Sequence, residues 1–290
     1  MKEIWRGLLT NQIEEADIII IGNPYDGATS CGKGAAFGPD KMRELSHYLP
    51  PVTYQGTPLT LKIYDLGNFD HYKANEDQSL YQGALQTNRF ILQLGGDHSV
   101  SIATQRAFIK KHQGKKVGLI HCDAHADLCD IYDNNQYSHA SVNRRAIDAG
   151  FTHQDIAYVG IRSWELEEVA FMNKNAHHYY PMATIEQLGL HCVIDELKEY
   201  FAAYDVVYLS LDIDIIDPAF APGTGTPEAG GFTSSGILKF IRSLVWNLPV
   251  QAMDIVEVAP PLDQNDITSW LALKIAYEVF GALQEKNKNQ

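Results

Sequence analysis

Four polar side chains alternate with other residues in the segment HCDAHADL, residues 121–128. They are His121, Asp123, His125 and Asp127, and they follow the apolar run VGLI. Imidazole nitrogens and carboxylate oxygens bind metal ions, and they also serve as general acids and bases. The same spacing fits the polar face of a surface strand, because alternate residues of a strand point to one side. Two interpretations stand at this point, a metal site and a solvated strand.

Histidine and acidic residues also end or follow three other apolar runs. The runs are RFILQLGG (89–96), DVVYLSLD (205–212) and QAMDIVEV (251–258), and the polar residues are His98, Asp212, Asp214 and Glu257. In a parallel α/β sheet, ligands bind beyond the carboxyl ends of the strands, which share one edge. We therefore expect these residues to meet the 121–128 segment at that edge.

The predicted ligand set contains two imidazoles and four carboxylates. Its members are His98, Asp123, His125, Asp127, Asp212 and Asp214. Oxygen ligands with a minority of imidazole favour Mn²⁺ or a similar octahedral ion over structural zinc. Four carboxylates at one edge repel each other, and two divalent ions would balance their charge. Such a pair of ions is a known hydrolytic device, because it lowers the pKa of a bound water.

Short apolar runs alternate with helical patterns along the whole chain. Strands are predicted at 16–22, 61–67, 89–96, 116–123, 155–161, 205–212 and 251–258, with a weaker candidate at 178–182. Helices are predicted at 39–48, 77–88, 100–112, 138–150, 163–175, 193–204, 233–247 and 267–284. Near-continuous apolar strands between helices predict a parallel sheet covered on both faces. About eight strands leave two architectures open, a closed barrel and an open three-layer sandwich.

The bulk properties restrict the class of protein. We expect one domain over residues 1–290, and the net charge of −13 argues against nucleic acid as a partner. No apolar stretch approaches about 18 residues, so we expect no membrane span. The four cysteines form no CxxC pair, and the N-terminus is polar and carries acidic residues, unlike a secretion signal. Reduced thiols and a cytoplasmic location are therefore expected.

Three segments resemble the signature blocks of the ureohydrolase family, which includes arginases and agmatinases. They are GGDHS (95–99), DAHADL (123–128) and SLDIDIIDPAFAPGTGTPEAGG (210–231), and the similarity extends to the glycine-rich loop at 27–40 and to MDIVEVAP (253–260). The resemblance implies a three-layer α/β/α sandwich with an eight-stranded, mostly parallel open sheet. It also implies homo-oligomers, either trimers or hexamers.

The resemblance further implies two Mn²⁺ ions per subunit. One ion would be held by His98, Asp123, Asp127 and Asp212. The other would be held by His125, Asp123, Asp212 and Asp214, so that Asp123 and Asp212 bridge the two.

Four residues would carry out the chemistry. Asp127 would orient the nucleophile, and Glu257 would hold the substrate guanidinium in a bidentate, charge-assisted pair. His139, in YSHAS at 137–141, stands where the family places a general acid for the leaving amine. Its alternative role is that of an N-terminal helix residue. Thr226 would add a polar contact near the guanidinium.

The segment after the second block bears on the substrate. Arginases bind the substrate's α-carboxylate there, whereas this chain reads LCDIYDNNQYSHAS and has Cys129 where an Asn is expected. The segment resembles the agmatinase branch, which predicts a small cationic guanidino substrate and hydrolysis of agmatine to putrescine and urea. Asp130 and Asp133 could meet the distal ammonium or could simply be solvated. The alternatives are a guanidinobutyrase, formimidoylglutamase or arginase activity, or a non-catalytic metal-binding homologue.

The remaining polar residues lie outside the predicted ligand set. His121 lies inside its predicted strand, and either a buried core position or a position beside a metal ligand fits it. His177 and His178 are adjacent and would point to opposite faces of a strand, so we expect no metal pair there. Asp97 and Asp217 are expected to stabilise loops, since Asp before Pro218 favours a turn.

Overall fold

Eight parallel strands form one open sheet in the computed structural model, which describes residues 3–69, 84, 87–175 and 178–288. The strands are β1 (Ile18–Gly22), β2 (Ile63–Asn68), β3 (Phe90–Leu94), β4 (Val117–Cys122), β5 (Ile156–Val159), β6 (His178–Tyr180), β7 (Val206–Asp212) and β8 (Val250–Val256). Their order is β2-β1-β3-β8-β7-β4-β5-β6. The sheet ends at β2 and β6, so the open sandwich is confirmed and the barrel alternative is wrong.

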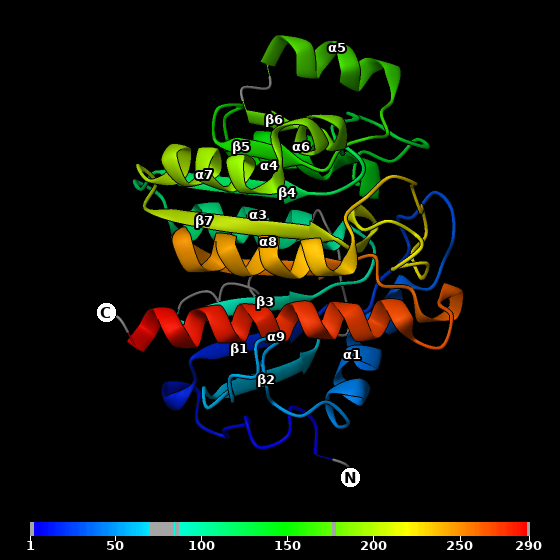
Figure 1. The fold of residues 1–290 in the computed structure, drawn as a ribbon. Coiled ribbons are helices and arrows are strands. Elements are labelled where there is room, and N and C mark those ends of the chain that lie inside the picture. Colours follow the sequence, from blue (N-terminus) through cyan, green and yellow to red (C-terminus); the bar gives the residue numbers. More distant parts are fainter. Residues whose placement is uncertain (1–2, 70–83, 85–86, 176–177, 289–290) are drawn as a thin grey trace.

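Helices cover both faces of the sheet. They are α1 (Gly38–Ser46), α3 (Val100–Lys111), α4 (Val142–Ala149), α5 (Leu166–Asn175), α6 (Met182–Leu188), α7 (Leu190–Phe201), α8 (Ser234–Asn247) and α9 (Ile267–Lys288). In Figure 1, α7, α8 and α9 lie in front of the sheet and α3 and α4 lie behind it. α6 was not predicted, and most of the helix predicted at 77–88 lies outside the described residues.

Two apolar cores flank the sheet, and β1 shows how one strand serves both. Ile18 and Ile20 belong to the core that includes residues of α1, α7, α8 and α9. Ile19 and Ile21 belong to the core that includes residues of α3 and α4. Successive strand residues point to opposite faces, so a strand covered on both sides must be apolar throughout. Full burial of each isoleucine contributes about 1.5–3 kcal/mol.

The strand order places the ends of four particular strands side by side. β3, β8, β7 and β4 are consecutive neighbours in the middle of the sheet, although β7 and β8 come late in the chain. In Figure 1 the arrow of β7 points to the right, where the loops of residues 23–37, 214–231 and 257–266 gather. The carboxyl edge of the central strands is therefore framed by long loops.

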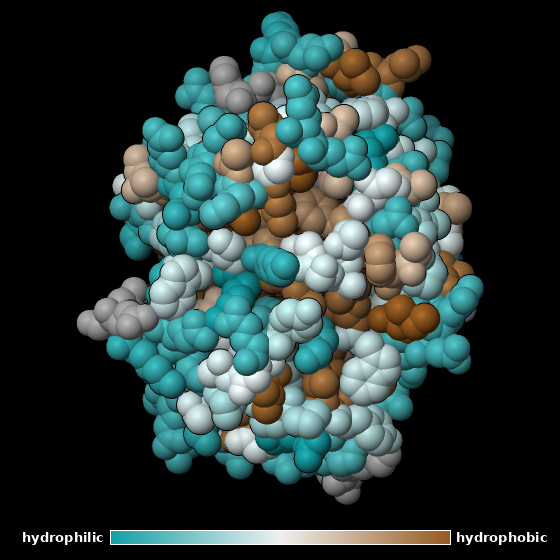
Figure 2. All heavy atoms as spheres, viewed as in Figure 1, coloured by the Kyte–Doolittle hydropathy of each residue, from teal (hydrophilic) through white to brown (hydrophobic). Residues whose placement is uncertain are grey.

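The outer surface is mixed in character. Figure 2 shows hydrophilic and hydrophobic atoms interspersed over the face that α7, α8 and α9 cover, with hydrophobic surface near one end of α5. Leu166 and Val169 of α5 are 90% and 40% exposed. Among the described helices, none is long and apolar enough to cross a membrane.

A close backbone contact holds the loop of residues 23–37 against the end of β3. The main-chain N–H of Asp97 donates a hydrogen bond to the carbonyl of Tyr25 at 2.7 Å. A Cβ atom on Gly96 would lie 1.8 Å from that same carbonyl oxygen. Only glycine therefore lets the two segments approach this closely.

Replacing Gly96 with alanine should destabilise the fold, because the new methyl group would push the two backbones apart. We expect Gly96→Ala to lower the free energy of unfolding in urea by about 2 kcal/mol or more. Gly114→Ala is the control, since a Cβ there meets nothing within 4 Å and only the positive φ of 87° opposes it. The control should lose about 1 kcal/mol, and equal losses in the two variants would contradict the steric explanation.

Candidate metal centre and substrate cavity

The predicted ligands lie together at the carboxyl edge of the central strands. His98 follows β3, Asp123 directly follows β4, and Asp212 ends β7. Asp214 lies in the short helix η4 (Ile213–Ile215), where its N–H donates to the Asp212 carboxylate at 2.9 Å. A local turn thus keeps the two aspartates of SLDID side by side.

One group of ligands centres on Nδ1 of His98. This nitrogen lies 3.0 Å from Oδ2 of Asp123, 3.1 Å from Oδ2 of Asp127 and 3.2 Å from Oδ2 of Asp212. All four side chains are buried. These are the residues that the family resemblance assigned to one ion.

The second group centres on Nδ1 of His125. It lies 3.0 Å from Oδ2 of Asp214 and 3.5 Å from Oδ1 of Asp123. Asp123 therefore presents Oδ1 to this group and Oδ2 to the His98 group. The arrangement is the one that a carboxylate shared between two ions requires.

The charges and hydrogen bonds of the cluster fit divalent cations. Burial raises the pKa of Asp212 well above its usual value, and the charges of Asp214 and Asp123 raise it further. The Nδ1 atom of His98 and the Oδ2 atoms of Asp123 and Asp127 are buried and make no hydrogen bond within the described part of the chain. Buried carboxylates and a bare imidazole nitrogen form a donor set of the kind that binds such ions.

His121 belongs to this cluster rather than to the apolar core. It is fully buried, with Nε2 3.1 Å from Oδ2 of Asp123 and 3.0 Å from the carbonyl oxygen of His125. Its ring stacks on that of His98 with 5.2 Å between the centroids. Of the adjacent histidines 177 and 178, His177 lies outside the described residues. The ring of His178 packs against that of Tyr200, with 3.4 Å between the ring centroids.

Two acidic residues of the site have left-handed backbone conformations. Asp127 has a φ of 53° and Glu257 has a φ of 61°. The Asp127 carbonyl accepts the N–H groups of Asn143 and Arg144 at the start of α4, and the Glu257 N–H donates to the carbonyl of Gly96 at 2.8 Å. Unfavourable conformations of this kind persist where the surroundings fix them, and they concentrate at functional sites.

A cavity of about 220 Å³ opens beside the cluster. It is lined by Ser30, His125, Asp127, Cys129, Tyr132, His139, Ala140, Ser163, Trp164, Glu165, Glu168, Asp212 and Thr226. Thr226 also donates a hydrogen bond to Oδ2 of Asp214 at 3.2 Å. No lysine or arginine is among these described lining residues, so the cavity is acidic.

Two carboxylates that line the cavity differ from those that the sequence suggested. Asp130 pairs with Arg145 at 2.5 Å, and neither it nor Asp133 lines the cavity. Glu165 and Glu168 line it instead. Both follow β5, so the rule that pointed to the ends of the other strands could have found them.

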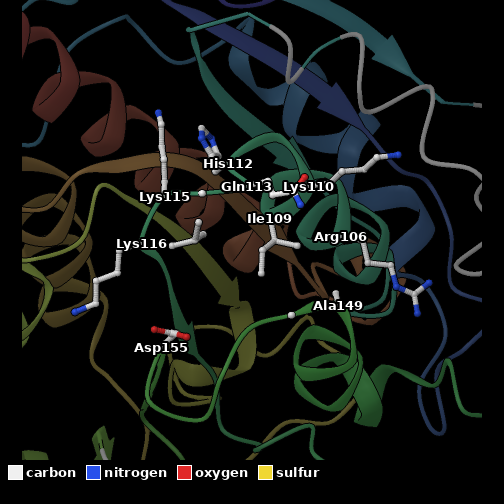
Figure 3. Close-up of a pocket in the computed structure, with 12 residues that line it drawn as sticks. Arg106, Ile109, Lys110, His112, Gln113, Lys115, Lys116, Ala149 and Asp155 are labelled. Carbon is white, nitrogen blue, oxygen red and sulfur yellow. The ribbon is translucent and has the colours of Figure 1, made fainter.

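A larger cavity of about 670 Å³ lies at the opposite edge of the sheet, between the ends of α3 and α4 and the start of β4. Its rim includes Arg106, Lys110, Lys115 and Lys116, and Figure 3 shows these side chains pointing outward in different directions. The Nζ atom of Lys116 lies over the ring of Tyr204, 4.1 Å from the ring centroid. The positive charges do not converge on a common point.

The model of the arginase family matches residues 16–281 of this chain. The chain belongs to the arginase family. Its members are hydrolases that act on amidino C–N bonds, and this arginase-family chain is therefore a hydrolase of that class. The family assignment agrees with the clustering of histidines and aspartates at the sheet edge.

The relatives differ in the substrates that their names state. The solved structure of proclavaminate amidinohydrolase from Streptomyces clavuligerus superimposes with a TM-score of 0.89 at 30% identity, covering 99% of this chain and 98% of that one. An agmatinase from Bacillus subtilis is 34% identical, with 92% of each chain covered. A guanidinobutyrase from Pseudomonas aeruginosa is 32% identical, covering 94% of this chain and 88% of the relative.

In this arginase-family site, the loops after β3 and β5 are held by a buried aspartate and a half-buried arginine. The Asp97 carboxylate accepts the N–H groups of Ala28 at 2.8 Å and Ser99 at 3.0 Å. The Arg162 guanidinium donates to the carbonyl oxygens of Gly160, Asp214, Ile215, Glu228 and Ala229. Asp217 accepts N–H groups from Ala219 and Gly230, in the loop role that was predicted for it.

His139 connects the cavity to Glu257. It lies in the short helix η3 (His139–Ser141), and its Nδ1 is 3.4 Å from Oε1 of Glu257. Oε1 also accepts the N–H of His98 at 2.9 Å. On the other side of the ring, Nε2 accepts the N–H of Ser30 at 3.1 Å. Glu257 is buried behind His139 and does not itself line the cavity.

The surroundings of His139 favour its protonated form. Burial alone would lower its pKa, but the contact with Glu257 and the charges of Glu257, Asp127 and Asp97 raise the pKa to about 9. The Ser30 N–H works against this rise, because Nε2 accepts that hydrogen bond only when it is unprotonated. The Ser30 hydroxyl oxygen also lies 2.8 Å from Nε2 and can accept a hydrogen bond from the protonated ring. A histidine that retains a proton near neutral pH can donate it to a leaving amine.

The pH profile of hydrolysis should report this histidine. Because the pKa of His139 is raised, its proton is present near pH 7 and is lost as the pH rises through about 9. We expect kcat of the wild type to fall over that range. In His139→Asn, kcat at pH 7 should decrease by about 100-fold or more, and its fall at high pH should disappear. A mutant whose high-pH limb is unchanged would exclude His139 as the group that titrates.

Proposed function

We propose that this protein hydrolyses agmatine to putrescine and urea with two Mn²⁺ ions bound per subunit. The observation that carries the substrate assignment is the charge of the cavity. Two carboxylates outside the proposed ligand set line it, those of Glu165 and Glu168, and its described lining has no lysine or arginine. Identities of 34% to an agmatinase and 32% to a guanidinobutyrase do not separate the two substrates.

The charge of the substrate tail separates them. A guanidino acid would bring its carboxylate toward Glu165 and Glu168 without a cationic partner, and repulsion would disfavour it. The ammonium group of agmatine would instead meet an opposite charge. Cys129, which also lines the cavity, offers no replacement for the amide that binds a substrate carboxylate in arginases.

The two groups described above would hold the metals, with Asp212 added to the His125 group as the family resemblance implies. His98, Asp123, Asp127 and Asp212 would hold one ion, and His125, Asp123, Asp212 and Asp214 would hold the other. When bound, such a pair of ions supplies Lewis acidity that lowers the pKa of a water molecule toward neutrality. Octahedral sites rich in carboxylate suit Mn²⁺.

The neighbouring residues would bind the substrate and move its proton. Asp127, which faces both His98 and the cavity, would orient the attacking water by accepting a hydrogen bond from it. His139 would protonate the leaving amine. Glu257 would attract the guanidinium and hold His139 in place through the 3.4 Å contact, and Thr226 would offer its oxygen to the guanidinium while it donates its proton to Asp214.

Urea release from a panel of substrates tests the proposal. With Mn²⁺ present, we expect kcat/KM for agmatine to exceed that for arginine, guanidinobutyrate and formiminoglutamate by about 100-fold or more, because an unpaired charge in the cavity costs several kcal/mol. Formamide release replaces urea release for formiminoglutamate. A preference for one of the acids would overturn the substrate, and no turnover of any of the four would favour a non-catalytic homologue.

The outer carboxylate allows a sharper test of agmatine binding. Glu165 lines the cavity, is exposed, and presents its charge at the entrance. We expect Glu165→Gln to raise KM for agmatine about fivefold with little change in kcat, since a partly exposed ion pair contributes about 1 kcal/mol. Steady-state kinetics at low ionic strength would measure this.

Asp133→Asn is the matched control for Glu165→Gln. It removes one exposed negative charge near the site, but Asp133 does not line the cavity. Its KM should stay close to that of the wild type. Equal increases of KM in the two variants would indicate general electrostatic attraction in place of a specific contact with Glu165.

A further inference from the structure

A buried aspartate lies behind the His98 ligand group, in a mostly apolar strand. Asp254 of β8 is fully buried and is the register partner of Ser210 in β7. Its Oδ1 accepts the Ser210 hydroxyl at 2.8 Å and the N–H of Leu211 at 3.1 Å. Its Oδ2 lies 2.7 Å from the hydroxyl of Tyr208.

Ser210 links this carboxylate to His98. The Ser210 oxygen is 2.9 Å from Nε2 of His98, and the residue is fully buried. A serine hydroxyl has a single proton to donate. Because the carboxylate takes that proton, the Ser210 oxygen can only accept from the ring, and the proton of the neutral imidazole must be on Nε2.

The position of this proton matters at the opposite side of the ring. Nδ1 of His98 is the atom that faces Asp123, Asp127 and Asp212 at 3.0–3.2 Å. A neutral imidazole binds a metal ion through its unprotonated nitrogen, and the hydrogen bond of the other nitrogen decides which one that is.

We propose that Asp254 and Ser210 are positioning residues that fix the proton of His98 on Nε2 and keep Nδ1 available for a metal ion. The inference rests on the proposed metal centre and adds two residues to it. Without an acceptor on Asp254, the Ser210 hydroxyl could turn and donate to Nε2. The ring proton would then move to Nδ1, which would remove this ligand atom.

Titration of the protein with Mn²⁺, followed by electron paramagnetic resonance of the free ion, tests the inference. We expect the wild type to bind two ions and Ser210→Ala to bind one of them about 10- to 100-fold more weakly. The weakened ion is the one that His98 would hold, so the other binding step should change little. A general loss of folding would weaken both steps, and thermal unfolding of the metal-free variant checks for it.

Tyr208→Phe is the matched control. It also removes a hydroxyl that donates a hydrogen bond to the Asp254 carboxylate, but this hydroxyl binds Oδ2. The link from Oδ1 through Ser210 to His98 therefore stays intact. Its Mn²⁺ affinity should stay within about threefold of the wild type. If Tyr208→Phe lost as much affinity as Ser210→Ala, the effect would come from the carboxylate's charge or packing, and the proposed link would be wrong.

Nuclear magnetic resonance gives a direct second readout. In ¹⁵N-histidine-labelled protein loaded with diamagnetic Zn²⁺, His98 should show its proton on Nε2. A proton on Nδ1 would overturn the inference. If the wild type bound two Mn²⁺ ions and Ser210→Ala bound them with unchanged affinity, the inference would be wrong but the proposed metal centre would stand. If the wild type bound fewer than two ions, both the proposed metal centre and the inference would be wrong.

Discussion

Four carboxylates crowded into one buried edge of the sheet are the constraint on which the rest of this structure depends. Asp123, Asp127, Asp212 and Asp214 are each at most 5% exposed. One carboxylate oxygen of each lies 3.0–3.2 Å from Nδ1 of His98 or His125. Burial of like charges is unfavourable unless cations compensate them. The two histidines supply part of this compensation, and metal ions would supply the remainder.

The surrounding hydrogen bonds keep this unfavourable cluster in one geometry. Asp97 ties the loop of residues 23–37 to the start of α3, and Arg162 binds five carbonyl groups around the Asp214 turn. Asp254 and Ser210 stand behind His98. These polar side chains belong to different strands and loops. The geometry of the site therefore depends on the order of the strands in the sheet.

The sequence predicted the residues of the histidine and aspartate cluster more completely than those of the cavity wall. The cluster residues follow strongly apolar runs within contiguous segments, so local patterns are enough to find them. Asp130 was a plausible partner for the substrate, but its own partner Arg145 lies in α4, and a sequence does not reveal such a pairing. Glu165 follows β5, but its segment was predicted as a helix. Its place in the cavity depends on the contact between the segments that follow β5 and β4.

By itself, the sequence determined a parallel α/β sheet covered on both faces and the residues that end its strands, because hydrophobic periodicity is a local property of the chain. The resemblance of its three blocks then implied the open sheet. Only the tertiary structure decided that β8 and β7 lie between β3 and β4, and this order brings Asp254 behind His98 and leaves an acidic cavity beside the cluster. Such neighbours are set by packing between distant segments, which no local pattern encodes.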